Sequence, residues 1–290
     1  MRMTDDRSPI LKLSNVCKTY ELKGQQAVQA LQNVDLALYP GECLGIVGQS
    51  GSGKSSLAKC VTQLEQATSG EIWYHGQEIN RLKGEKLRQM RKQIQMVFQE
   101  PATIFNPRMK VGMFIGEPLL NYKMMKRQAA AQETRKLLER VGLSALDANK
   151  YPHELSGGQQ QRAVIARAIG VRPEIILFDE ATSALDVSIQ QQILDLLMEL
   201  RRETGVSSIF ISHDLAVVQQ VSDRIAVMHQ GRVVEVVNSS KLTSLANHSY
   251  TRSLMSSALS LRELKGEMQM RERVEILAGA DEVEDKQGYA

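Results

Sequence analysis

The chain has 290 residues, of which 42% are hydrophobic, 24% are charged and 4% are aromatic, and its formal net charge is +3. This composition is typical of a soluble globular protein with one large domain, or with a core and a subdomain. The small net charge and the few aromatic residues argue against a nucleic-acid-binding function, which calls for a basic surface or for stacking side chains.

The first part of the chain alternates between strand and helix patterns. Residues 10–16 and 28–38 have the spacing of half-buried strands. A turn at residues 40–42 precedes the apolar run Cys43–Val47, which predicts a buried strand. Apolar residues recur at helical spacing over 54–64, so the pattern is strand, loop and helix.

The loop between this strand and this helix fits the phosphate-binding pattern G-x-x-x-x-G-K-[ST] at every fixed position. Its glycines lack a Cβ atom and can adopt positive φ, so that several backbone N–H groups can converge on phosphate oxygens. Lys54 can reach the β- and γ-phosphates, and Ser55 offers a hydroxyl group to Mg²⁺. The loop consists of Gly48, Gln49, Ser50, Gly51, Ser52, Gly53, Lys54 and Ser55.

Past the loop, the chain predicts a strand at residues 71–74 and another at 93–98, which places Gln99 at its C-terminal end. The strand pattern then gives way to a segment with several prolines and to a helical pattern at 128–141. We therefore expect a helical subdomain over about residues 100–165.

Strand and helix patterns return after residue 171. Continuous apolar strands at 175–178 and 208–211 are separated by an amphipathic helix at 189–201. Two further strands are expected between residues 224 and 237. Apolar strands separated by helices predict a mostly parallel sheet covered on both faces.

Polar side chains follow several of these strands, at the edge where the carboxyl ends of parallel strands meet. Asp179 would face Mg²⁺ beside the phosphate loop, and Glu180 could orient or deprotonate the attacking water. His213 would lie near the γ-phosphate and Gln99 near Mg²⁺ or the water, although each of these two residues alone is also compatible with an ordinary surface position.

A second glycine-rich segment begins another predicted helix. Ser156 fits an N-cap and Gln159 fits the third position of a capping box. Such a helix start can bind an anion. Because one nucleotide needs only one phosphate loop, the segment is expected to serve a nucleotide held by another subunit. The segment is Leu155-Ser156-Gly157-Gly158-Gln159.

With these motifs in order, residues 10–260 resemble the ATP-binding subunit of ABC transporters. The resemblance implies an α/β P-loop NTPase (RecA-like) core with a mostly parallel sheet, an N-terminal antiparallel β part and an inserted helical subdomain. It implies an ABC domain over 8–260 and a charged tail over 261–290. The matching motifs are Walker A (Gly48 to Ser55), the Q-loop (Gln99), the LSGGQ signature (Leu155 to Gln159), Walker B (Ile175 to Glu180), the D-loop (Ser183-Ala184-Leu185-Asp186) and the switch histidine (His213).

The resemblance also implies roles for individual residues and the cofactors ATP and Mg²⁺. Glu180 and His213 would be catalytic, and Tyr20 would stack on adenine. Ala181 stands where the family usually has proline, which removes no catalytic group, so hydrolysis is expected. The implied nucleotide-binding residues are Tyr20, Gly48, Gln49, Ser50, Gly51, Ser52, Gly53, Lys54, Ser55, Ser56 and Gln99; Ser156, Gly157, Gly158, Gln159 and Asp186 would act on the partner's ATP; and Ser55, Gln99 and Asp179 would bind the metal.

Within the family, the chain resembles the importers of oligopeptides, dipeptides and nickel. The resemblance lies in residues 99–101 (QEP), 105–108 (FNPR) and 248–252 (HSYTR), where Ser249 replaces the usual proline. It implies an ATPase that powers the import of small peptides or nickel across the inner membrane. No cysteine follows residue 60, so an iron–sulfur cluster is not expected.

The resemblance implies three kinds of partner and no nucleic acid. They are a second ATP-binding subunit that is a different, related chain, two membrane permeases and an extracytoplasmic substrate-binding protein. The subunit would lie on the cytoplasmic face of the inner membrane as a peripheral protein. No apolar run approaches the roughly 18 residues that span a bilayer, and residues 1–10 lack a signal-peptide core. The cysteines lack C-x-x-C spacing, so neither structural disulfides nor a zinc site is expected.

Two alternative functions are a non-transport ABC ATPase and an exporter subunit. Translation factors of this family usually carry two ATP-binding domains, and the chain has one phosphate loop. Repair proteins insert long coiled coils, for which Gln99 and Ser156 are too close in sequence. Residues 105–108 and the C-terminal segment disfavour an exporter.

Overall fold

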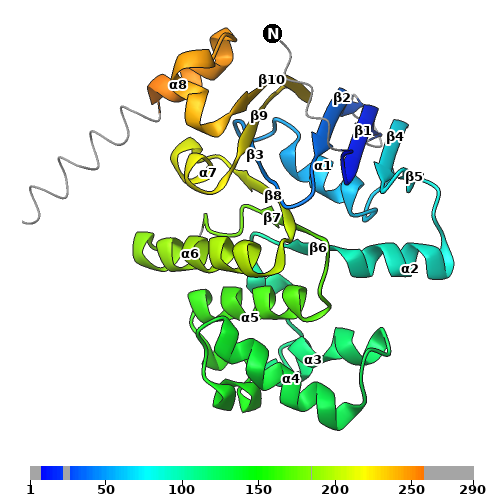
Figure 1. Cartoon of the computed structure of the whole chain (residues 1–290), viewed down its shortest axis with the longest axis vertical. Helices are drawn as coiled ribbons and strands as arrows, with labels where there is room; N and C mark the ends of the chain where they lie inside the picture. The colour runs from blue at the N-terminus through cyan, green and yellow to red at the C-terminus, as the bar shows by residue number, and fades with distance from the viewer. Residues whose placement is uncertain (1–7, 22–26, 184, 258–290) are drawn as a thin grey trace, which may run out of the picture.

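A computed structural model describes residues 8–21, 27–183 and 185–257. Ala184 of the D-loop motif and the predicted tail at 261–290 lie outside these residues. The described chain forms two sheets and a group of helices at one end (Figure 1). The α/β fold with a mostly parallel sheet and an N-terminal antiparallel part is confirmed.

The main sheet has six strands in the order β10-β9-β3-β8-β7-β6. Every neighbouring pair is parallel except β9 and β10, which are antiparallel. The carboxyl ends of the five parallel strands therefore meet at one edge, as the sequence predicts. The strands are β3 (Cys43–Val47), β6 (Ile94–Val97), β7 (Ile175–Asp179), β8 (Ser207–Ser212), β9 (Arg224–His229) and β10 (Arg232–Asn238).

The second sheet has four strands in the order β2-β1-β4-β5. Its long strands are antiparallel, with Leu13 of β1 opposite Leu36 of β2 and Ile72 of β4. These residues are buried in one hydrophobic core together with Ile46 of β3 and Leu57 of α1. The antiparallel sheet thus covers one face of the main sheet; its strands are β1 (Leu11–Tyr20), β2 (Val28–Leu38), β4 (Ser69–Tyr74) and β5 (Gln77–Glu78).

Helices cover the other face of the main sheet. Consecutive residues of β7 point into different cores: Ile176 belongs to the core with Leu197 of α6 and Val218 of α7, and Leu177 belongs to the core with the antiparallel sheet. This face is covered by α6 (Val187–Thr204) and α7 (Leu215–Val221), whereas α1 (Lys54–Val61) and α2 (Gly84–Gln93) pack into the core with the antiparallel sheet.

Three helices pack together at the end of the molecule opposite the antiparallel sheet (Figure 1). They are α3 (Val111–Asn121), α4 (Arg127–Arg140) and α5 (Gly157–Gly170). Helix α5 begins in the predicted helical region and continues to Gly170. After β10, the chain forms α8 (Leu242–Leu245) and a last helical stretch at residues 249–257. Across the described ranges, no helix has both the length and the apolar character to cross a membrane.

Candidate functional site

The phosphate loop joins β3 to α1 at the carboxyl edge of the main sheet. Gly53 precedes α1 with φ 102°, a conformation that favours glycine. A Cβ atom on Gly53 would lie 2.4 Å from the Ala30 carbonyl oxygen, and one on Gly48 would lie 2.2 Å from the Met228 carbonyl oxygen. The backbone therefore passes too close to β2 and β9 for any other residue at these two positions.

Lys54 is buried inside the loop, with 4% of its surface exposed. Its Nζ donates to the carbonyl oxygens of Gly48 (2.8 Å) and Gln49 (3.0 Å) and lies 3.9 Å from Glu180 Oε1. Burial lowers the pKa of Lys54, and the nearby carboxylates of Glu180 and Asp179 oppose this shift. The ammonium group is thus placed between the loop backbone and the two carboxylates.

Asp179 and Ser55 lie side by side, as expected for groups at the carboxyl ends of parallel strands. The Ser55 hydroxyl donates to Asp179 Oδ1 at 3.1 Å. Burial raises the pKa of the Asp179 carboxyl group, and the hydrogen bond from Ser55 opposes the rise. The pair presents two oxygen atoms of the kind that Mg²⁺ prefers.

Glu180 lies between two basic side chains at the end of β7. Its Oε2 is 3.4 Å from Nδ1 of His213, which follows β8, and its Oε1 faces Lys54. Glu180 has φ 49°, in the left-handed region that non-glycine residues rarely adopt. Such strain is often found where the surrounding fold holds a functional side chain in place.

The Gln99 side chain lies near Ser183 rather than beside the Ser55–Asp179 pair. Its Nε2 donates to the Ser183 hydroxyl at 3.4 Å, and that hydroxyl donates to the Glu180 carbonyl oxygen. In the part of the chain that the structure describes, no hydrogen bond joins Gln99 to Ser55 or Asp179. Gln99 therefore contacts the site indirectly, through Ser183, which bonds to the Glu180 carbonyl oxygen.

Tyr20, at the end of β1, lies over the start of α1. Its hydroxyl donates to the Glu65 carboxylate and lies 3.3 Å from the Ser56 hydroxyl. Burial and the Glu65 contact raise the pKa of Tyr20. The Lys18 ammonium lies 4.8 Å from the ring centroid and makes a cation–π contact with one face of the ring. Glu65 has no sequence signal for this contact, because only the fold brings it to Tyr20.

The second glycine-rich segment forms the capping box that the sequence predicts. The Gln159 N–H donates to Ser156 Oγ at 3.3 Å, and the Ser156 N–H donates to Gln159 Oε1 at 3.0 Å. A Cβ atom on Gly158 would lie 2.7 Å from Ile189 Cγ2, whereas nothing lies within 4 Å of one on Gly157. Asp186 caps α6 by accepting from the Ile189 N–H at 2.9 Å.

These residues lie apart from the phosphate loop of the same chain. Over the described ranges, no hydrogen bond or ion pair joins Ser156, Gln159 or Asp186 to residues 48–56. The structure thus places the predicted site residues in two groups, one at the carboxyl edge of the sheet and the other at the starts of α5 and α6.

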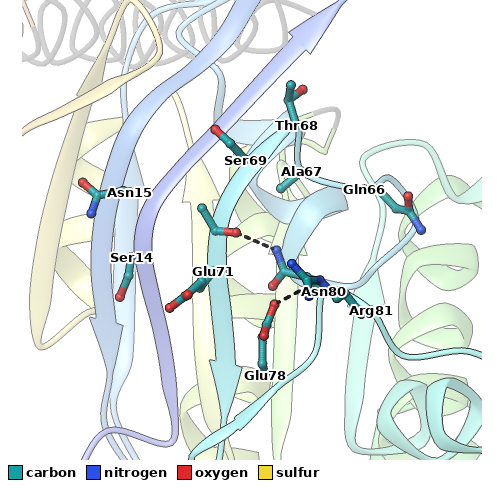
Figure 2. Close-up of a pocket in the computed structure, with 11 residues that line it drawn as sticks. Ser14, Asn15, Gln66, Ala67, Thr68, Ser69, Glu71, Glu78, Asn80 and Arg81 are labelled. Atoms are coloured by element: carbon teal, nitrogen blue, oxygen red, sulfur yellow. Dashed lines mark hydrogen bonds and ion pairs between the residues drawn. The ribbon is translucent and has the colours of Figure 1, made fainter.

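A separate polar hollow of about 680 Å³ lies on the antiparallel sheet (Figure 2). Asn80 crosses it and bonds to the Gly70 carbonyl oxygen, and Arg81 pairs with Glu78 at 3.9 Å. None of the predicted site residues lines this hollow. Other lining groups bond to residues outside the hollow, as Glu71 does to Trp73 and Thr68 to Thr19.

Comparisons with known proteins agree on one family. The family model described as ABC transporter matches residues 31–183. The glutathione import ATP-binding protein GsiA of Pectobacterium atrosepticum is 44% identical over 254 residues, which cover 86% of this chain and 41% of that protein. The chain thus spans about two fifths of the length of GsiA. The oligopeptide transport ATP-binding protein OppF of Streptococcus mutans is 43% identical over 255 residues, covering 88% of this chain and 83% of OppF.

Solved structures show the same fold. The dimeric post-hydrolysis state of the ATP-binding cassette MJ0796 bound to ADP and Pi has a TM-score of 0.73 and 34% identity, covering 79% of this chain and 98% of that chain. CbiO1 from Clostridium perfringens, part of the ABC transporter complex cbiONQ, has a TM-score of 0.72 and 25% identity, covering 91% of this chain and 100% of that chain.

Proposed function

Because this chain belongs to the ABC transporter family, we propose that it is the ATP-hydrolysing subunit of an importer for small peptides. The observation that carries the proposal is the buried Lys54 ammonium, held between the phosphate loop and Glu180. Peptides are proposed rather than nickel because similar proteins are named for glutathione import and oligopeptide transport.

The phosphate loop fits a triphosphate and Mg²⁺. The buried Ser52 hydroxyl has no hydrogen-bond partner within the structure, which suits an oxygen of a bound phosphate. Lys54 and the loop N–H groups would hold the phosphates, and Ser55 and Asp179 would hold Mg²⁺. The bound metal would neutralise charge on the phosphates. Glu180 would accept the proton of the attacking water, and His213 would orient the Glu180 carboxylate.

A second ATP-binding subunit would complete the site. Gly157 is exposed, and no described side chain lies within 4 Å of the position of a Cβ atom there, so another molecule could approach the start of α5 closely. In a head-to-tail pair, Ser156 to Gln159 and Asp186 would face the partner's ATP, as the resemblance implies. The dimeric state of MJ0796 supports a paired arrangement. A different, related chain is proposed as the partner.

The helical region is proposed to contact the permeases. A hollow of about 500 Å³ lies between α3 and α4, and the apolar side chains of Met113 and Leu120 are exposed beside it. With two permeases and an extracytoplasmic binding protein, the subunit would work on the cytoplasmic face of the inner membrane. Deleting the gene in its native host tests the substrate class: loss of di- or oligopeptide uptake supports the proposal, and selective loss of nickel uptake contradicts it.

Asp179→Asn is expected to raise the Mg²⁺ concentration that gives half-maximal ATP hydrolysis by about tenfold or more. The amide keeps the shape of the side chain but removes one of the few charged ligands that a bound Mg²⁺ would have. The measurement is an Mg²⁺ titration of ATPase activity. Asp195→Asn, an exposed carboxylate on α6, is the control. An unchanged Mg²⁺ requirement in Asp179→Asn would remove Asp179 from the metal site.

Gly157→Ala is expected to leave the isolated subunit folded and able to bind ATP, but to lower the ATPase activity of the assembled complex by about tenfold or more. Among the described residues the added methyl group meets no other part of the fold within 4 Å, so a loss is expected to arise at the face that another subunit approaches. Circular dichroism, ATP binding and complex ATPase activity test this. A complex that keeps full activity would argue against a partner nucleotide at the start of α5.

A further inference from the structure

The C-terminal helical segment returns to the phosphate loop. The backbone N–H of Gln49 donates to the Tyr250 hydroxyl at 3.1 Å, although 201 positions separate the two residues in the sequence. Gln49 is the second residue of the phosphate loop, and Tyr250 lies in the helical stretch at 249–257. The catalytic arrangement described above makes no use of this contact.

Tyr250 is held in place by several neighbours. The Glu235 carboxylate on β10 accepts hydrogen bonds from the backbone N–H groups of Asn247 (2.8 Å) and His248 (3.3 Å). His248 Nδ1 in turn accepts from the Tyr250 N–H at 3.2 Å. The Tyr250 ring packs on the His229 ring, with centroids 3.9 Å apart. Contacts with β9 and β10 therefore fix the position of the Tyr250 hydroxyl group.

The start of the phosphate loop is held from two sides. Lys54 binds the carbonyl oxygens of Gly48 and Gln49, and Tyr250 binds the Gln49 N–H. Phosphate oxygens would compete with those carbonyls for the Lys54 ammonium. The Gln49 N–H is already donated to Tyr250, so the phosphate oxygens would bind the other N–H groups of the loop. The bond to Tyr250 can thus persist while Lys54 turns to the nucleotide.

We propose that Tyr250 is a positioning residue of the nucleotide site, whose hydroxyl group holds the first peptide of the phosphate loop and couples that loop to the C-terminal helical segment. The inference rests on the proposed ATP-binding function. Because coupling between two sites is reciprocal, ATP binding should also stabilise residues 247–257.

Tyr250→Phe in the full chain tests this inference, because the ring and its packing on His229 remain while the hydroxyl group is lost. We expect the Kd for ATP, measured with Mg²⁺ by calorimetry, to rise about two- to tenfold, the range that the loss of one hydrogen bond gives. In ATP hydrolysis measured over a range of ATP concentrations, kcat should change less than KM. Hydrogen–deuterium exchange should show that ATP protects residues 247–257 in the wild type and protects them less in Tyr250→Phe.

Tyr122→Phe, at the end of α3, is the matched control and should bind ATP as the wild type does. A Tyr250→Phe variant with wild-type ATP affinity and full ATP-dependent protection would overturn the inference. Equal losses in both variants would also overturn it, because the effect would then not depend on the Gln49 contact. A wild-type chain that fails to bind ATP would instead refute the proposed function, and with it this coupling.

Discussion

Glu180→Gln is expected to slow ATP hydrolysis by about 10²- to 10⁴-fold, the usual contribution of a positioned general base. Glutamine has the shape of glutamate but cannot take up a proton at neutral pH. Because Lys54 and the phosphate loop are untouched, ATP affinity should stay close to that of the wild type. ATP should then accumulate in a stable pair of subunits, which size-exclusion chromatography in ATP would detect.

The control for this variant is Glu203→Gln, which neutralises a partly exposed carboxylate on α6 that pairs with Arg140. It should hydrolyse ATP at the wild-type rate. If Glu180→Gln also hydrolysed ATP at the wild-type rate, another group would have to be the base, and the strained backbone at Glu180 would need a different explanation.

Lys54→Met is expected to weaken ATP binding by about 10- to 150-fold, because a hydrogen bond to a charged group contributes about 1.5–3 kcal/mol. Methionine keeps most of the apolar stem, so the buried space around it remains filled. The variant loses the only cation that the structure places against both the loop carbonyls and Glu180 in the described residues. Calorimetry with ATP and Mg²⁺ measures the change.

Lys136→Met, on the exposed face of α4, removes the same charge far from the loop and should leave ATP affinity unchanged. A second comparison separates binding from folding: thermal unfolding without nucleotide should show that Lys54→Met is folded. Wild-type affinity in a folded Lys54→Met protein would contradict the placement of the phosphates in this loop.

The carboxyl edge of the sheet could be predicted because its groups follow strands with clear sequence patterns. The apolar runs at β3 and β7 are continuous, and their side chains are buried in both cores. Once those strands lie parallel in one sheet, with only β8 between them, Asp179 must come near the phosphate loop. The 3.1 Å contact between Ser55 and Asp179 follows from this topology.

Short or interrupted elements were harder to predict. Helix α3 contains Pro118, and a proline usually indicates the end of a helix rather than its interior. The interior position is tolerated because the Phe114 carbonyl oxygen, which Pro118 cannot bond, accepts a hydrogen bond from Arg167. Helix α7 has only seven residues, too few for a clear periodic pattern, and its start depends on the Asp214 cap.

Contacts between distant segments could not be predicted from the sequence. Gln99 is expected near Mg²⁺ or the attacking water, and its amide donates to the Ser183 hydroxyl, a contact that no sequence pattern indicates. The contact of Tyr250 with Gln49 depends on how β10 and the last helical residues pack against β9. Strand patterns give the edge on which a residue lies, but side-chain direction depends on packing that only the folded chain provides.

Peptide uptake by proteoliposomes tests most directly whether this chain powers peptide import. The proteoliposomes contain the complex purified from native membranes, with ATP on the side of the ATP-binding subunits and the binding protein on the other side. ATP-dependent accumulation of a labelled small peptide is expected with the wild type, and none with Glu180→Gln. Peptide uptake that persists with Glu180→Gln, or ATP hydrolysis with no peptide uptake in the wild type, would contradict this function.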